Sequence, residues 1–322
     1  MASVPRILQF EPIQKEKIWG SETWLLSDFG SDLSTVVEPG TNLPSSFRTL
    51  YQSLPESVLG KPFLNQQFPL LIKTIQAKQK LSVQVHPDDE YASKYDPESA
   101  GKKECWMVLA AEPNAELVIG FDQKTDKDSY ELLVKQNKGE EILRKWKVQP
   151  GDVFLLNPGT IHAIGSGVTL LELQQSSDST YRVYDYGRLG DNGKPRDLHL
   201  EKALAVLNFN ASDGSEKQIP KLIGYQPFTR YLFTSNEKFR LELWKFAQSQ
   251  NINLVQLSQP HSFGVLHVIQ GSISSTEYGI TFKKNDTIFL SADSFAHGSK
   301  FQCSKNTDVA FMGSGTDWVE WV

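Results

Sequence analysis

Short runs of strand-forming residues, separated by turn residues, recur along this chain and restrict the folds open to it. Val, Ile, Leu and aromatic residues dominate these runs, and Gly, Pro, Asn, Asp or Ser separate them. Before residue 190 they cover residues 68–75, 80–85, 105–110, 117–120, 152–156, 168–174 and 181–186. Many short strands with few helices predict a mainly β fold that is closed or sandwiched and antiparallel.

Helical patterns are fewer. Residues 129–146 have apolar positions near helical spacing with charges between them, and Gly139 is expected to divide this segment. Asp197 is a candidate cap for a second helix that runs through residues 201–207. Residues 88–90 are acidic and follow Pro87, so we expect them to form a turn that ends the strand at 80–85.

The length of 322 residues favours two domains, and the polar residues 212–222 are a candidate linker. Strand signals resume beyond it at residues 231–233, 239–246, 261–270, 280–282 and 287–290. The two halves resemble each other weakly, because residues 151–156 lead to His162 much as residues 285–290 lead to His297. We therefore predict two related barrels, in domains 1–215 and 216–322.

The second barrel is predicted to be degenerate. No Gln-x-His-Pro run and no Lys-x-Glu pair precedes His297, so this residue is expected to be a turn or core histidine.

Composition limits the partners and the compartment expected for this protein. The net charge of −5 favours neither nucleic acid nor an anionic membrane as partner. No apolar run approaches the roughly 18 residues of a membrane span, and residues 1–10 lack a secretory signal. Two cysteines, Cys105 and Cys303, fit a reducing compartment, so we expect a cytoplasmic protein.

Four residues form a candidate metal site. Side chains alternate along a strand, so Gln84 and His86 point to the same side as Ser82. Glu104 opens the next strand, and His162 follows a Pro-Gly turn. Two imidazoles, a carboxylate and an amide oxygen suit zinc, and a catalytic zinc site leaves a position open for water or substrate. The alternative is a strand whose polar face simply meets solvent.

Two further segments carry charged residues in strand patterns. Glu172 and Gln174 alternate with leucines and share one side, and a carboxylate facing a barrel interior is costly unless it is paired or functional. Arg182 shares a face with Tyr184 and Tyr186. Its planar guanidinium could hold a phosphate or a developing enediolate oxygen, although a solvated strand edge would look the same.

Several of these segments together resemble the type I phosphomannose isomerases, specifically their shorter bacterial form. The resemblance rests on LSVQVHPDDEYA (81–92), GKKECW (101–106), PGTIHAIGSG (158–167) and SDSTYRVYDYGR (177–188), with support from IWGSETWLLS (18–27) and FPLLIKTIQAKQ (68–79). It implies two cupin-type (jelly-roll) β-barrel domains and one zinc ion per chain. It also implies a phosphorylated hexose substrate, with mannose 6-phosphate and fructose 6-phosphate interconverted.

The resemblance also implies roles for individual residues. It places Gln84, His86, Glu104 and His162 on the zinc, Arg182 and Lys102 in the active site, and Ser82 and Arg188 on the substrate phosphate. Longer family members carry a His and a Tyr where this chain has Gly101 and Ile164, so roles at those two positions do not transfer.

The base that takes the proton from carbon is left open between Glu172, which we favour, and Lys102. Two other functions compete with the isomerase. One is another cupin isomerase or epimerase that acts on a related phosphosugar, and the other is a sugar sensor without catalysis. Retention of Glu172, Lys102 and Arg182 beside the metal set argues against the sensor. A nucleotide site is disfavoured, because Gly165-Ser166-Gly167 lacks the remaining glycine of that motif.

Overall fold

The computed structural model describes residues 5–38, 46–97, 100–190, 193–255 and 261–314. The chain divides into two compact units. The first unit consists of Met1–Ile13, Leu25–Leu71 and Ile219–Val322, and the second of Gln14–Trp24 and Ile72–Gln218. Segments near the N-terminus therefore cluster with the C-terminal third. The domain bounds 1–215 and 216–322 stay a prediction. That the C-terminal domain is a degenerate cupin stays a prediction.

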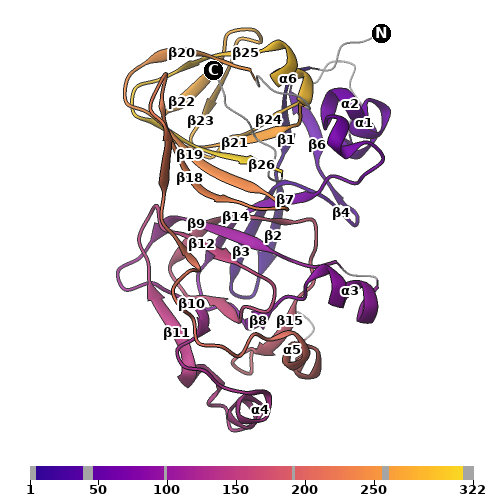
Figure 1. The fold of residues 1–322 in the computed structure, drawn as a ribbon, viewed down its shortest axis with the longest axis vertical. Helices are drawn as coiled ribbons and strands as arrows, with labels where there is room; N and C mark the ends of the chain where they lie inside the picture. The colour runs from indigo at the N-terminus through magenta and orange to yellow at the C-terminus, as the bar shows by residue number, and fades with distance from the viewer. Residues whose placement is uncertain (1–4, 39–45, 98–99, 191–192, 256–260, 315–322) are drawn as a thin grey trace. The chain divides into compact units, whose positions relative to one another are not determined.

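Two sheets build most of the second unit (Figure 1). The seven-stranded sheet has the order β16 (Lys217–Gln218), β12 (Val153–Leu156), β9 (Glu104–Ala111), β14 (Val168–Gln175), β7 (Leu70–Ala77), β3 (Gly20–Leu26) and β2 (Ile13–Lys17). The five-stranded sheet has the order β11 (Leu143–Lys147), β10 (Glu116–Phe121), β13 (His162–Ile164), β8 (Val83–Val85) and β15 (Tyr181–Tyr184). All pairings in the five-stranded sheet are antiparallel, as predicted.

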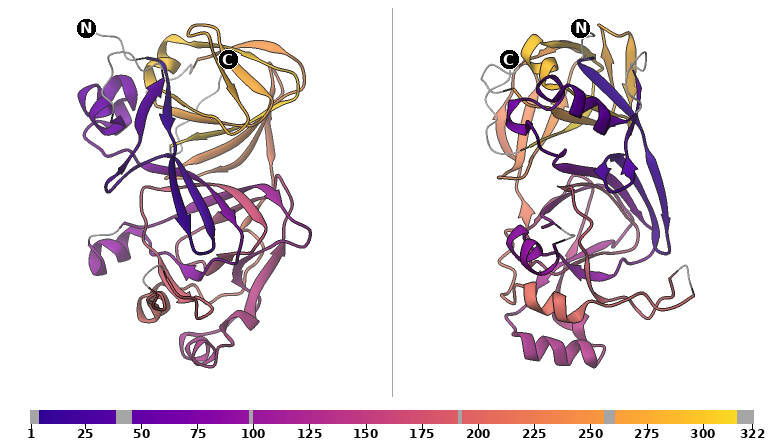
Figure 2. Two further views of the ribbon diagram at one scale, coloured as in Figure 1. Left: turned by 180° about the vertical axis from the view of Figure 1, so that it is seen from behind. Right: turned by 90° about the vertical axis from the view of Figure 1, so that its right-hand side faces the viewer.

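The two faces of the five-stranded sheet have different surroundings. Val83 and Val85 belong to a buried cluster that includes Tyr130 and Leu204, which come from helices α4 (Lys127–Lys135) and α5 (Leu200–Val206). Figure 2 shows from two further sides that these helices lie outside the five-stranded sheet. Gln84, between the two valines, lines a cavity instead. The predicted alternation of polar and apolar faces is thus confirmed.

Three local predictions were wrong. Residues 143–147 form β11 rather than a continuation of the helix, because they pair with β10 and Trp146 Nε1 donates to the Ile119 carbonyl at 3.1 Å. Helix α5 begins after His199, and Asp197 does not cap it. The expected acidic turn is the start of helix α3 (Asp89–Tyr95), where the Asp88 side chain accepts a hydrogen bond from the Tyr91 N–H at 2.7 Å.

The first unit also contains two main sheets. The larger has the order β17 (Lys221–Gly224), β18 (Thr229–Ser235), β19 (Arg240–Phe246), β26 (Thr307–Gly313), β21 (Gly264–Gln270), β24 (Thr287–Leu290), β1 (Ile7–Glu11) and β6 (Thr35–Glu38). The smaller has the order β20 (Gln250–Leu254), β25 (Ser299–Cys303), β22 (Ser272–Ser275) and β23 (Ile280–Lys283), and β4 (Asp28–Phe29) pairs with β5 (Asp32–Leu33). Trp244 and Phe311 stack in its core with ring centroids 4.8 Å apart.

Short helices complete this unit: α1 (Phe47–Ser53), α2 (Pro55–Val58), the 3₁₀ helix η1 (Lys61–Phe63) and α6 (Ala292–His297). The second unit contains another 3₁₀ helix, η2 (Gly139–Ile142). His297 is the exposed last residue of α6. The candidate linker 212–222 contains β16 and the start of β17. None of the helices within the described residues is long and apolar enough to cross a bilayer. Cys105 and Cys303 are buried free thiols.

The turn between β2 and β3 requires glycine. Gly20 has φ +147°, and a Cβ atom there would lie 2.0 Å from the carbonyl oxygen of Gln76. We expect Gly20→Ala to lower the free energy of unfolding by roughly 2–4 kcal/mol, through backbone strain and steric overlap. Urea denaturation would measure this loss.

Gly151→Ala is the matched control. Gly151 also has a positive φ, +92°, but nothing lies within 4 Å of its would-be Cβ. Gly151→Ala should therefore lower the free energy of unfolding only by the strain component, about 1–3 kcal/mol. Equal losses in the two variants would contradict the steric explanation.

Candidate metal centre and active-site cavity

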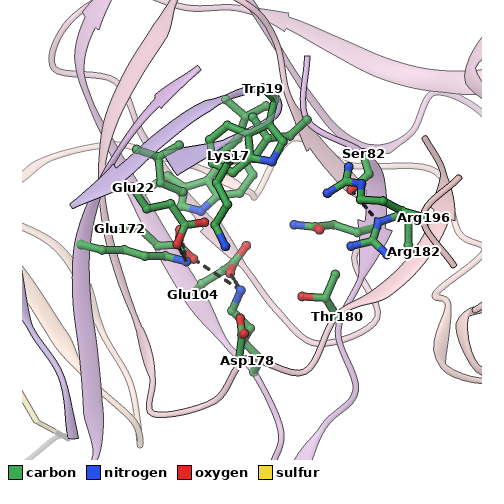
Figure 3. Close-up of a pocket in the computed structure, with 17 residues that line it drawn as sticks. Lys17, Trp19, Glu22, Ser82, Glu104, Glu172, Asp178, Thr180, Arg182 and Arg196 are labelled. Carbon is green, nitrogen blue, oxygen red and sulfur yellow. Dashed lines mark hydrogen bonds and ion pairs between the residues drawn. The ribbon is translucent and has the colours of Figure 1, made fainter. Parts of the chain in front are cut away.

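A cavity of about 300 Å³ lies within the second unit. Its wall is made by side chains from both sheets and from the segments that flank β8 and β15 (Figure 3). The β2–β3 hairpin contributes Lys17, Trp19 and Glu22, which are far in sequence from the other lining residues. Such a cavity, polar and formed by rigid strands, is a suitable place for a small-molecule site.

His86, Glu104 and His162 form a buried cluster in which the candidate ligand atoms all lie within 4.8 Å of one another. His86 Nε2 is 3.5 Å from Glu104 Oε2, and His162 Nε2 is 3.3 Å from Glu104 Oε1. The three residues stand at the ends of strands, with Glu104 opening β9 and His162 opening β13. The sequence prediction that these side chains meet is confirmed.

Backbone carbonyls orient both imidazoles. Nδ1 of His86 lies 2.5 Å from the Ser179 carbonyl oxygen, and Nδ1 of His162 lies 2.8 Å from that of Thr160. Since a carbonyl can only accept, Nδ1 carries the proton in each ring and Nε2 keeps its lone pair. Metal-ligating histidines are commonly held in this way.

The protonation states also favour a metal ion. Burial lowers the pKa of His86 to about 3, and nearby Lys102 contributes to this shift. Burial likewise lowers the pKa of His162, so both rings are neutral at physiological pH. Burial alone would raise the pKa of Glu104, but the charge of Lys102 is the largest of the effects that outweigh burial and hold the pKa well below its usual range. Two neutral imidazoles and a carboxylate form a donor set that zinc accepts.

Glu104 has unused acceptor capacity. Within the described residues neither of its carboxylate oxygens accepts a hydrogen bond, although Lys102 Nζ lies 2.9 Å from Oε2. A buried carboxylate normally has its lone pairs satisfied. A metal ion between Glu104 and the two imidazoles would satisfy them, so the residues present fit such an ion.

Gln84 lies beside this cluster. Strand pairing places it opposite His162, and its Nε2 is 3.3 Å from His162 Nε2. An amide binds metal through oxygen, so ligation by Gln84 would require its amide group to turn by 180°. Its role as the fourth ligand stays a prediction.

Charged side chains continue from the cluster in an unbroken chain. Lys102 lies 3.5 Å from Glu172, Glu172 lies 3.5 Å from Lys73, and Lys73 lies 3.6 Å from Glu22. The side chains of Lys73, Lys102 and Glu172 are at most 5% exposed. Burial at this depth requires each charge to have an opposite partner.

Ionisation within this chain follows from burial and pairing. Burial raises the pKa of Glu172, and Lys73 only partly offsets that effect. Burial alone would lower the pKa of Lys102, but Glu104 and Glu172 outweigh it and raise the pKa. Lys73 behaves similarly, because Glu172 and Glu22 raise its pKa against burial. Both lysines are therefore ammonium ions.

Arg182 and Ser82 both line the cavity. Arg182 Nε lies 3.4 Å from Ser82 Oγ, and Arg182 Nη1 donates to the Asp197 carbonyl at 2.8 Å. Arg188 is placed differently. It is not among the described residues that line the cavity, and it binds the Asp185 carboxylate and the Lys80 carbonyl. Its predicted contact with a phosphate remains untested.

Sequence reasoning missed several lining residues: Lys17, Glu22, Lys73, Asp178, Thr180 and Arg196. Lys73 carried a usable signal, because a lysine inside the apolar run 68–75 is out of place in a buried strand unless it is paired. The sequence around Arg196 gave no such signal. This residue lies in a polar loop, and only the fold brings it to the cavity.

Comparisons with known proteins agree with this geometry. Residues 13–104 match the family model for the catalytic domain of type I phosphomannose isomerase. Mannose-6-phosphate isomerase ManA of Bacillus subtilis is 34% identical over 306 residues, covering 88% of this chain and 92% of that protein. Mannose-6-phosphate isomerase of Streptococcus mutans is 32% identical over 277 residues, covering 84% and 82%.

A solved structure is also similar over nearly the whole chain. The crystal structure of mannose 6-phosphate isomerase from Bacillus subtilis superimposes with a TM-score of 0.82 at 28% identity, and covers 96% of this chain and 100% of that one. This likeness confirms the predicted mainly β, cupin-type fold.

Lys73 should be important for stability. We expect Lys73→Met to lower the free energy of unfolding by about 3–5 kcal/mol, because it leaves the buried carboxylates of Glu22 and Glu172 without their shared cation. Lys202→Met is the control, since it breaks an exposed ion pair with Asp96 and should cost less than about 1 kcal/mol. Urea denaturation of both variants tests this difference, and similar losses would contradict it.

Proposed function

The chain belongs to the type I phosphomannose isomerase family, and we propose that it interconverts D-mannose 6-phosphate and D-fructose 6-phosphate with one bound zinc ion. The observation that carries this proposal is one cavity with a His–Glu–His cluster beside two further ionisable groups, Glu172 and Lys102. The similarity to enzymes named mannose-6-phosphate isomerase supports the choice of substrate. We place the reaction in the cytoplasm.

His86, Glu104 and His162 would hold the zinc ion, with Gln84 as the fourth protein ligand. The backbone contacts that fix both imidazole Nδ1 atoms support this assignment, because they direct each Nε2 toward Glu104. When bound, zinc would supply Lewis-acid stabilisation of negative charge on the oxygens of the sugar.

The isomerisation requires two proton transfers. A proton leaves C2 and one returns at C1 through a cis-enediol, while another moves between O1 and O2. Glu172 is our choice for the carbon base, because its carboxylate lines the cavity and is held between Lys73 and Lys102. Lys102, an ammonium ion beside Glu104, would be the acid–base partner for the oxygens.

Arg182 would stabilise the enediolate, and Ser82 with Arg188 would anchor the phosphate. Arg182 is suited to this role because its guanidinium borders the cavity and stays charged at any physiological pH. Removal of Glu172, Lys102 or Arg182 should therefore impair the reaction without emptying the metal site.

Two rival functions predict different results in assays with sugar phosphates. An isomerase or epimerase for a related phosphosugar would convert glucose 6-phosphate faster than mannose 6-phosphate. A sugar sensor would bind mannose 6-phosphate without turnover. The chain of buried charges favours catalysis, since binding alone does not require a carboxylate between two lysines in the cavity.

Metal dependence can be tested directly. We expect purified protein to contain about one zinc ion per chain, to lose isomerase activity with a chelator and to regain it with zinc. Elemental analysis and a coupled assay of fructose 6-phosphate formation measure both quantities. Glu104→Gln should lose zinc and activity, whereas Glu131→Gln, which alters an exposed i,i+4 pair, should lose neither. Full activity after complete metal removal would disprove the proposal.

Arg182 should affect turnover and leave the metal in place. We expect Arg182→Met to lower kcat by roughly 100-fold or more, the usual effect of removing one stabiliser of a developing oxyanion. Its zinc content should equal that of the wild-type protein, because Arg182 is not in the ligand cluster. His162→Ala provides the comparison, since it should lose zinc as well. Loss of zinc from Arg182→Met would contradict the assignment.

A further inference from the structure

The arginines and the carboxylates of the cavity lie on different sides. Figure 3 shows Glu22, Glu104, Glu172 and Asp178 gathered on one side together with Lys17, and Arg182, Arg196 and Ser82 on the other. The acidic side contains the candidate metal cluster. The arginine side therefore offers a place for a negatively charged part of a ligand.

Arg196 is held firmly on the arginine side. Its Nε donates to Asp185 Oδ2 at 2.7 Å, and its Nη2 donates to Asp185 Oδ1 at 2.5 Å. The Asp185 side chain is only 5% exposed. A side-on pair of this kind fixes the plane of the guanidinium and leaves Nη1 for another acceptor. Among the described residues no hydrogen bond from Arg196 Nη1 occurs.

This side of the cavity also carries more positive than negative charge. Asp185 is shared by two arginines, Arg188 and Arg196. Arg182 donates to neutral acceptors, the Ser82 hydroxyl and the Asp197 carbonyl. Burial lowers the pKa of Arg182, and repulsion from Arg196 and Arg188 adds to that effect, while Asp185 and Asp197 only partly oppose it. Since arginine does not lose its proton in proteins, an anion is the means of relieving this repulsion.

The spacing suits one substrate that reaches both sides. Ser82 directly precedes β8 and Gln84 lies in its middle, and both line the cavity. Two residues along a strand span about 6.6–6.8 Å. This distance is comparable with the length of an extended hexose chain from its reacting carbons to its phosphate.

We propose that Arg196, oriented by Asp185, binds the substrate phosphate beside Ser82 and thereby makes the cavity selective for phosphorylated sugars. The proposal rests on the proposed function and adds to it a phosphate-binding residue, Arg196, and the carboxylate that orients it, Asp185. Arg196 contacts the phosphate, and Asp185 is a positioning residue that acts through Arg196. Arg188, which the proposed function also assigns to the phosphate, pairs with the same carboxylate but is not among the described residues that line the cavity.

The first test replaces Arg196 and measures phosphate recognition. In Arg196→Met we expect KM for mannose 6-phosphate to rise roughly 10- to 100-fold. A charge-assisted hydrogen bond contributes about 1.5–3 kcal/mol, and each 1.4 kcal/mol is tenfold. The inhibition constant of inorganic phosphate should rise with it. KM should rise more than kcat falls, and zinc content should be unchanged.

Arg144→Met is the matched control. Arg144 lies in the same unit, outside the lining of the cavity, where its Nη1 donates to the Ser212 carbonyl at 2.8 Å. This variant loses the same charge and should keep the wild-type KM and phosphate inhibition. Arg196→Lys should fall between wild type and Arg196→Met, because it keeps a charge but loses the fork to Asp185.

Asp185 is tested with a double variant. Asp185→Asn should weaken phosphate inhibition, and it should do so much less in an Arg196→Met background, because both changes act on one contact. A full additional effect in that background would show that Asp185 does not act through Arg196.

Two results would overturn the assignment. One is an unchanged inhibition constant for inorganic phosphate in folded Arg196→Met. The other is an inhibition constant for inorganic phosphate that rises in Arg188→Met but not in Arg196→Met, which would show that Arg188 alone binds the phosphate. Failure of the proposed function is separate, because it would appear as zinc-loaded wild-type protein without isomerase activity. In that case, calorimetric binding of mannose 6-phosphate to wild type and Arg196→Met still decides the role of Arg196.

Discussion

The antiparallel pairing of β8 with both of its neighbours is the constraint on which the site depends. Gln84 lies opposite His162 on β13 and opposite Arg182 on β15. One three-residue strand therefore aligns the metal cluster with the candidate catalytic arginine. A shift of one residue would turn Gln84 into the apolar cluster and Val83 or Val85 into the cavity, so burial of the valines stabilises this register.

Charge balance is the second determinant of the site. Lys73 and Lys102 carry two positive charges among the three carboxyl groups of Glu22, Glu104 and Glu172, which form a connected chain shielded from water. Burial raises the pKa of Glu172, so its ionisation requires further positive charge nearby. A divalent ion beside Glu104 would meet that requirement, so the same arrangement that is costly to bury also favours metal binding.

The opposite side of the cavity uses arginines instead. Arg182 and Arg196 are permanently charged and point into the space that the acidic side leaves open. Asp185 holds Arg196 in a fixed plane, which lowers the entropic cost of ligand binding. A ligand with a hydroxylated reactive end and an anionic end is complementary to both sides at once. A phosphorylated hexose has this chemistry.

The sequence by itself determined the residue types of the site and the strand alternation that separates Gln84 from Val83 and Val85. It also carried the family resemblance, because the motifs at 81–92 and 158–167 are local and remain contiguous in the folded protein. The mainly β fold followed from the same short periodic runs.

Only the tertiary structure decided which distant residues reach the cavity. Residues 143–147 became a strand because β10 offered them backbone partners, which overrode their helical pattern. Lys73 acquired a partner in Glu22 only through the β2–β3 hairpin, a contact between segments far apart in the chain. Arg196 borders the cavity from a polar loop and pairs there with Asp185. The geometry of these contacts depends on strand register and burial, which local sequence patterns do not encode.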